Sequence, residues 1–193
     1  MMNKDENNKK NDQERYHRFM KGDISGFEEL VLEYKNPLIL FIHRYVKDLH
    51  LAEDLAQDVF VDIYVYKERY DQKLGFKTYL FTIGRNKAID LLRKKHPLQG
   101  YVSLEDRVEQ ASEEDKLWNH LMQKERKEQV QAAFEQMKEE YVTVLLLIDF
   151  EQFTYIEAAQ IMHKSLGQIK VLVHRARKSL RKILEKEGFV YEE

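Results

Sequence analysis

The sequence predicts an all-α protein with two small helical domains, joined by a flexible linker, and a helix-turn-helix in the second domain. Glycine and proline, which interrupt helices, occur only seven and two times in 193 residues. Charged residues make up 34% of the chain, and apolar residues recur every three or four positions along most of it, as in helices with one buried face. A chain of this length forms one ordinary domain or two small ones.

Composition excludes several classes of protein. The chain has no cysteine, which excludes a disulfide framework and a thiolate metal site. Its longest strongly apolar run, residues 144–148, is far too short to cross a bilayer. The N-terminus is polar and mixed in charge, unlike a signal or transit peptide. We therefore expect a cytoplasmic protein without membrane insertion, and we expect residues 1–13 to be disordered.

The first domain is expected over residues 14–97. Asp23 is placed to cap a helix over residues 27–34. Pro37 stands where a first helical turn tolerates proline, and the helix continues through 38–42.

Two further helices complete this domain. The helix over 76–95 follows a polar loop at 71–75 and stops before Pro97. The other begins after a candidate cap at Asp48, and its apolar residues recur at intervals of four: Leu51, Leu55, Val59 and Ile63.

Periodicity fades over residues 98–116, which we assign to the linker, and the second domain is expected at 117–188. In it, an amphipathic helix over 117–137 leads into a second one at 141–150.

Two short helices near the C-terminal end, 155–162 and 166–177, are separated by the break at 163–165. Ala158 and Ala159 allow them to cross closely, and the second helix is basic. A helix-turn-helix presents its second helix to the DNA major groove in this way, although basic two-helix hairpins are also common in other proteins.

The charge is distributed unevenly, although the net charge is only −2. Residues 69–95 carry eight basic side chains against two acidic ones, and residues 164–186 carry eight against one. Residues 105–116, between them, hold six acids against two bases. This pattern predicts two nucleic-acid surfaces and a connector that avoids both.

Asp54, Asp58 and Asp62 lie four residues apart and share one helical face. Like charges at this spacing cost a few tenths of a kcal/mol per pair. The face is a docking surface for a basic partner, a metal site or a solvated surface, and the spacing alone leaves these three open. There is no HExxH, no Ser-His-Asp set and no Gly-rich phosphate loop, so catalysis has little support. An enzyme would have to use five carboxylates around a divalent metal: Glu28, Glu29, Glu33, Asp54 and Asp58.

The expected helix over 76–95 interleaves aromatic and basic residues. Rings near cations stack unpaired bases while the cations hold phosphates, but the same rings also suit a core. One stripe of this helix is suited to close packing: Leu80, Gly84, Ala88 and Leu91.

Four segments, 52–60, 76–93, 141–147 and 167–180, together resemble bacterial extracytoplasmic-function sigma factors, the small two-domain class of promoter-recognition subunits of RNA polymerase. The resemblance extends over about residues 27–184. It implies a protein without catalytic activity, metal or cofactor that binds core RNA polymerase, promoter DNA and an anti-sigma factor. The alternative is a helix-turn-helix regulator that is not a polymerase subunit.

The resemblance also implies roles for particular residues. Docking on the β′ clamp helices falls to Asp54, Gln57, Asp58 and Phe60. Recognition and melting of the −10 element fall to Gln72, Lys73, Phe76, Lys77, Tyr79, Arg85, Asn86 and Arg93. The second domain would bind the β flap and contact the −35 element through Ser165, Gln168, Lys170, Val171, His174, Arg175, Arg177 and Lys178.

Some positions depart from the family pattern. Met162-His163 stands where Leu-Gly is frequent, so a turn glycine is missing. Gln168 replaces the usual threonine, and Tyr79 stands where tryptophan is frequent. Val171-Leu172 replaces Ser-Arg, and the apolar Val171 is suited to a thymine methyl group.

Overall fold

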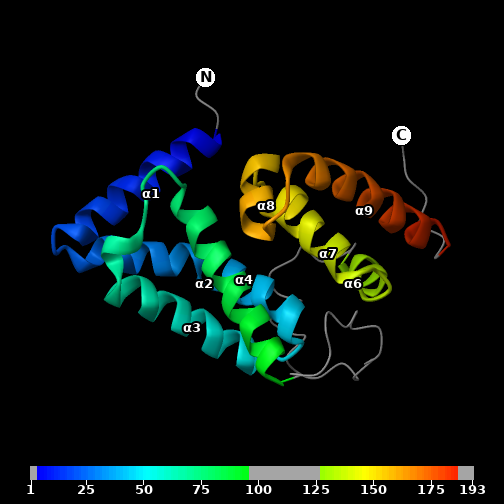
Figure 1. The fold of residues 1–193 in the computed structure, drawn as a ribbon, viewed down its shortest axis with the longest axis horizontal. Coiled ribbons are helices and arrows are strands. Elements are labelled where there is room, and N and C mark those ends of the chain that lie inside the picture. Colours follow the sequence, from blue (N-terminus) through cyan, green and yellow to red (C-terminus); the bar gives the residue numbers. More distant parts are fainter. Residues whose placement is uncertain (1–3, 96–126, 187–193) are drawn as a thin grey trace. The chain divides into compact units, whose positions relative to one another are not determined.

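The computed structural model describes residues 4–95 and 127–186, and the described residues contain helices and no strand (Figure 1). They fall into two compact units. The all-α fold class is confirmed. The helices of the first unit are α1 (Lys4–Met20), α2 (Ile24–Val46), α3 (Leu49–Val65), the 3-10 turn η1 (Lys67–Arg69) and α4 (Phe76–Lys95). Those of the second are α6 (Lys127–Glu135), α7 (Glu139–Leu145), the π-helical turn η2 (Leu146–Phe150), α8 (Tyr155–Met162) and α9 (Leu166–Lys186).

In the first unit, α1, α3 and α4 all pack on α2. The two predicted caps are confirmed: Asp23 accepts a hydrogen bond from the Ser25 N–H at 3.1 Å, and Asp48 accepts one from Leu51 at 2.9 Å. The prediction that Pro37 stands in a first helical turn is wrong, because α2 runs without a break from Ile24 to Val46 and Pro37 lies in its interior. Proline removes one backbone hydrogen bond from the helix interior. The burial of one face along a helix of 23 residues offsets that loss.

Two glycines allow close approach of helices to α2. A Cβ at Gly84 of α4 would lie 2.8 Å from Leu38 Cδ1, and a Cβ at Gly26 of α2 would overlap the carbonyl oxygen of Arg15 in α1. Real Cβ atoms do not make such contacts, so glycine sets how closely these helices lie.

The N-terminal segment corrects one prediction. We expected residues 1–13 to be disordered, but α1 begins at Lys4. Asp12, Tyr16 and Phe19 recur on one face of this polar helix and are buried. The Tyr34 hydroxyl of α2 donates a hydrogen bond to Asp12 at 2.6 Å. The burial of these side chains offsets the entropy lost when a polar segment folds.

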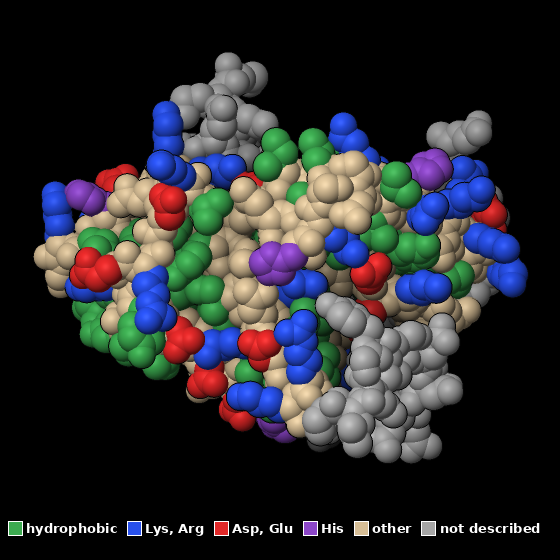
Figure 2. Space-filling model, viewed as in Figure 1, with side chains coloured by type: hydrophobic (Ala, Val, Ile, Leu, Met, Phe, Trp, Pro, Cys, Tyr) green, Lys and Arg blue, Asp and Glu red, His purple; other side chains and the backbone are tan. Residues whose placement is uncertain are grey.

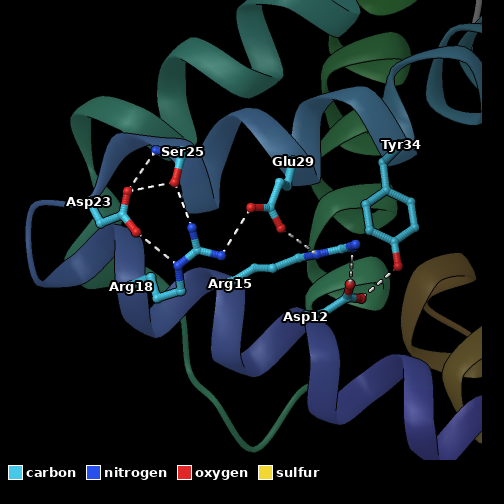
Figure 3. A network of polar contacts seen from close by, with 7 residues as sticks. All are labelled: Asp12, Arg15, Arg18, Asp23, Ser25, Glu29 and Tyr34. Atoms are coloured by element: carbon cyan, nitrogen blue, oxygen red, sulfur yellow. Dashed lines mark hydrogen bonds and ion pairs between the residues drawn. The ribbon is translucent and has the colours of Figure 1, made fainter.

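Figure 3 shows the polar network that joins α1 to α2. Glu29 of α2 accepts hydrogen bonds from Arg15 at 3.1 Å and from Arg18 at 2.9 Å. Burial raises the pKa of Asp12, and the Tyr34 hydroxyl and Arg15 oppose that shift in part. The pKa of Asp23 is lowered, because Ser25 and then Arg18 donate hydrogen bonds to its carboxylate.

In the second unit, α8 and α9 form the predicted helix-turn-helix, with the turn at residues 163–165. His163 has φ of 53° and occupies the left-handed conformation that glycine adopts most easily. It stands where the family pattern has its turn glycine. The expected linker, 98–116, lies outside the described residues, as does the part of the expected 117–137 helix before Lys127.

Candidate polymerase-binding and DNA-binding surfaces

The outer face of α3 carries three of the side chains expected to bind polymerase. Asp54, Gln57 and Asp58 are all exposed there. Asp62, the third of the aspartates spaced four residues apart, instead forms an ion pair with Lys87 of α4, with 2.7 Å between Asp62 Oδ2 and Lys87 Nζ. The charge of Asp62 is therefore balanced within the fold, and the face offers Asp54 and Asp58 to a partner.

A groove of about 440 Å³ lies between α2 and α3, beside this face. Gln57 belongs both to the face and to the groove wall. Phe60 is buried, its ring 6.3 Å from that of Phe27, so a partner reaches it only through the groove. Figure 2 shows hydrophobic side chains at the surface over this part of the first unit. The apolar lining consists of Phe27, Val31, Ile39, Ala56, Phe60, Val61 and Tyr64.

The 71–75 loop has an ordered backbone. The Lys73 N–H donates to the Asp71 carboxylate at 3.0 Å, and the Leu74 N–H donates to the Asp71 carbonyl oxygen at 3.0 Å. The Tyr70 hydroxyl, just before the loop, donates a 2.7 Å hydrogen bond to the Leu74 carbonyl oxygen near the end of the loop. The side chains of Gln72 and Lys73 are exposed, as the prediction requires.

Phe76 is a core residue, and its burial argues against the predicted contact with DNA. Its side chain is 1% exposed and packs against the rings of Tyr16, Tyr34 and Tyr70. Tyr79 is half-buried, with its ring 5.2 Å from that of Tyr70, and burial raises its pKa. Tyr79 is therefore the one of the two predicted rings that retains access to DNA.

The polar residues predicted on α4 fall on two faces. Asn86 and Arg93 are exposed and lie seven residues apart on one face. Lys77 and Arg85 are half-buried on a neighbouring face; Lys77 Nζ lies 5.7 Å from the Phe81 ring. The Nε of Arg85 is enclosed and makes no hydrogen bond to the described residues.

Helix α9 exposes the predicted base-reading side chains on one side. Lys170, Val171, His174 and Arg175 are exposed, and Val171 and Arg175 line a shallow hollow of about 350 Å³. Figure 2 shows Lys and Arg side chains gathered over α9. The opposite side of the helix is buried in the unit: Ile169, Val173, Ala176 and Leu184.

Ser165 and Gln168, two predicted DNA-binding residues, form a capping box at the start of α9. The Ser165 N–H donates to Gln168 Oε1 at 2.8 Å, and the Gln168 N–H donates to Ser165 Oγ at 3.2 Å. Thr154 and Glu157 form the same box at the start of α8. The Ser/Thr-x-x-Glu/Gln spacing of both boxes is visible in the sequence and was missed there.

Arg177, expected near DNA phosphates, is exposed, but it already has an acidic partner within the second unit. Its guanidinium forms a two-pronged ion pair with Asp149 at the π-helical end of α7. This pair raises the pKa of Arg177. Lys178, the next residue, is exposed. The two neighbours that we expected to contact phosphates are therefore both exposed, and Arg177 is the one paired with a carboxylate of its own unit.

Comparison with known proteins decides the family. The chain matches the family model described as Sigma-70 region 2 over residues 30–97 and the one described as Sigma-70, region 4 over residues 127–180. It is 30% identical over 175 residues to the ECF RNA polymerase sigma factor SigW of Bacillus subtilis, covering 85% of this chain and 91% of SigW. The chain belongs to the extracytoplasmic-function sigma factors.

Other similar proteins agree with this assignment. The RNA polymerase sigma-H factor of Pseudomonas aeruginosa is 29% identical over 183 residues, covering 90% of this chain and 94% of that factor. Two solved structures share the fold with TM-scores of 0.64: RpoE from Bartonella quintana in complex with the anti-sigma factor NepR, and CnrH in complex with the cytosolic domain of CnrY. They are 23% and 20% identical, and cover 82% and 91% of this chain and 96% and 98% of their own.

The sigma factor identity decides between the two readings of the helix-turn-helix. The chain directs transcription initiation as a polymerase sigma factor, and the reading as an unrelated DNA-binding regulator is set aside. Sigma factors are non-enzymatic initiation factors. In the described parts of the chain, no three His, Asp or Glu side chains are grouped as a metal site. Within the same residues, no helix is long and apolar enough to span a membrane.

Proposed function

We propose that this sigma factor divides promoter recognition among three surfaces. The α3 face with Asp54, Gln57 and Asp58 docks on the β′ clamp helices of core polymerase. The 71–75 loop and α4 engage the −10 element, and α9 reads the −35 element. The observation that carries this proposal is the presence, in one chain, of an exposed acidic docking helix and a helix-turn-helix with an exposed basic face.

We propose domains at residues 4–97 and 117–188, with a linker at 98–116, so the first domain begins with α1 instead of at the expected residue 14. The family matches at 30–97 and 127–180 support the cores of both domains. We extend the first domain to the N-terminal side of residue 30 because α1 packs on α2.

Docking is tested with charge reversals. Asp58→Arg and Asp54→Arg should weaken binding to core polymerase by roughly tenfold each, about 1.4 kcal/mol, and lower promoter-specific transcription in vitro. Glu28→Arg, an exposed reversal on α2, is the matched control. Core affinity that is unchanged in folded Asp58→Arg protein would contradict the docking assignment.

The −35 assignment separates two kinds of contact. Arg175→Ala should cost about 1–3 kcal/mol at one or two base positions if it pairs with a base edge. Lys178→Ala should weaken binding equally on all sequences, because a phosphate contact carries no sequence information. Binding to a panel of −35 variants distinguishes them, and identical behaviour of the two mutants would refute this division.

The −10 assignment is tested on the loop. Gln72→Ala with Lys73→Ala should reduce open-complex formation, measured as permanganate reactivity of unpaired thymines, because extruding a base costs a few kcal/mol that loop contacts offset. The defect should be smaller on a template already mismatched over the −10 element. Equal defects on both templates would place the effect in folding or polymerase binding.

Regulation completes the proposal. Both solved neighbours are sigma factors bound to an anti-sigma protein, NepR in one and the cytosolic domain of CnrY in the other. We assign an anti-sigma partner to this chain as well, and we assign it no catalytic activity of its own. A factor that acts on core polymerase and chromosomal promoters works in the cytoplasm. Co-purification of the chain with such a partner, released when core polymerase is added, tests this assignment.

A further inference from the structure

Helix α1 touches the 71–75 loop and the segment that leads into it. The Tyr16 hydroxyl donates a 2.7 Å hydrogen bond to the carbonyl oxygen of Lys67, in the turn before the loop. Gln13 Nε2 donates to the Gln72 carbonyl oxygen at 3.3 Å, within the loop. At the end of the loop, a Cβ on Gly75 would lie 3.4 Å from Lys9 Cε.

The same face of α1 continues into the aromatic core beneath the loop. The Tyr16 ring lies 4.6 Å from Tyr70 and 5.5 Å from Phe76, the two rings that flank the loop. Tyr70 in turn donates its hydroxyl to the Leu74 carbonyl oxygen. Side chains of α1 therefore reach the backbone before the loop, the backbone within it and the rings at both of its ends.

Helix α1 is itself fixed to α2. Asp12 is bonded to Tyr34, Glu29 binds both Arg15 and Arg18 (Figure 3), and the contact at Gly26 leaves no room for a side chain between the helices. A helix anchored on one side and bonded to a loop on the other restricts the conformations of that loop. Restriction before binding reduces the entropy lost when a ligand is captured.

We propose that α1 is a positioning element that holds the 71–75 loop in the conformation that meets the opened −10 strand, through Tyr16 and Gln13. This inference rests on the proposed role of the loop in strand opening. Both residues lie outside the region 2 match at residues 30–97. Tyr16 and Gln13 act through the backbone of the loop and need not touch DNA.

The test uses the full-length chain with core polymerase. Tyr16→Phe removes the hydroxyl and keeps the ring packing, and Gln13→Ala removes the amide. Glu14→Ala, an exposed substitution on α1, is the control, and Gln72→Ala with Lys73→Ala reports on the loop itself. Amide hydrogen exchange of peptides covering residues 67–75 measures loop order without DNA. Permanganate reactivity measures opening on duplex and pre-melted templates.

The expected result is faster exchange confined to residues 67–75 in Tyr16→Phe and Gln13→Ala, with α2 peptides unchanged. Open-complex formation on duplex should fall by roughly 2- to 10-fold, the range for one net hydrogen bond, and should recover on the pre-melted template. A helix that only stabilised the fold would instead raise exchange throughout the first unit and give equal defects on both templates.

Two results would overturn the inference and leave the role of the loop intact. One is unchanged exchange in both α1 variants while the loop double mutant fails to open DNA. The other is faster exchange in the α1 variants with normal opening beside that same defective loop mutant. Normal opening by the loop double mutant would instead refute the proposed function of the loop, and the inference with it.

Discussion

Replacing each of three helical glycines, Gly26, Gly84 and Gly167, by alanine should change stability by different amounts, because an added Cβ meets different surroundings at each. Replacing glycine by alanine inside a helix stabilises it by about 1 kcal/mol when the new methyl group has room. Forcing a methyl group into a packed core costs about 1–3 kcal/mol. The sign of each substitution therefore depends on what the added Cβ meets.

At Gly167, near the start of α9, the nearest atom is Ser165 Oγ at 3.9 Å, an ordinary contact, so alanine should stabilise the second unit by up to about 1 kcal/mol. At Gly84, the obstacle is the end of the Leu38 side chain at 2.8 Å, which can rotate away; the two terms leave a loss of about 0–2 kcal/mol. At Gly26, the obstacle is the Arg15 backbone, so the loss should be about 3 kcal/mol or more.

Urea unfolding followed by far-UV circular dichroism measures the three variants against the unchanged chain. Gly26→Ala and Gly84→Ala report on the first unit and Gly167→Ala on the second. The order of stability Gly167→Ala, Gly84→Ala, Gly26→Ala is the prediction. The reasoning would be refuted if Gly84→Ala cost more than Gly26→Ala, or if Gly167→Ala destabilised the chain by more than about 1 kcal/mol.

Three further predictions concern single side chains. Asp12→Asn keeps an acceptor for the Tyr34 hydroxyl and removes the buried charge. Because burial raises the pKa of Asp12 above 3.8, the unchanged chain should lose stability relative to the variant as the pH rises through that raised pKa. Urea titrations of both proteins at about pH 4 and pH 7 measure the difference. Arg177→Ala should lower stability by at most about 1 kcal/mol and leave the salt dependence of −35 binding unchanged, whereas Lys178→Ala should reduce that slope by about 0.9. His163→Gly should stabilise the second unit by about 0.5–1 kcal/mol, because His163 has φ of 53° and glycine adopts this left-handed conformation without strain. Thermal unfolding should show the gain as a higher melting temperature.

Local chemistry in the sequence was sufficient to predict most of the fold. Asp23 and Asp48 cap the helices that they were expected to cap, because an N-cap is a short-range hydrogen bond that leaves a recognisable residue type. Helix α1 was missed because its composition is polar. Its buried face carries Asp12, Tyr16 and Phe19, and a carboxylate in the first of these positions hides the apolar periodicity.

The candidate site was predicted less completely, for two different reasons. Phe76 lies four residues before Leu80 on the stripe that continues through Gly84, so the periodicity of α4 already placed it in the core. The ion pair between Arg177 and Asp149 was not predictable, because it joins residues 28 positions apart and depends on how α9 packs on α7.

The charges of the second unit bear on how strongly α9 attracts DNA. Three of the eight basic residues between 164 and 186 are engaged within the unit, as the ion pairs Lys164–Glu140, Arg177–Asp149 and Arg181–Glu185. Five remain to neutralise phosphates, which limits the logarithmic salt slope of binding to about 4.5 instead of about 7. We therefore expect the second unit by itself to have only a modest general attraction for DNA. If the first domain docks on core polymerase as proposed, docking raises the effective concentration of α9 at a promoter. We then expect α9 to bind the −35 element more tightly within the polymerase complex than in the free chain.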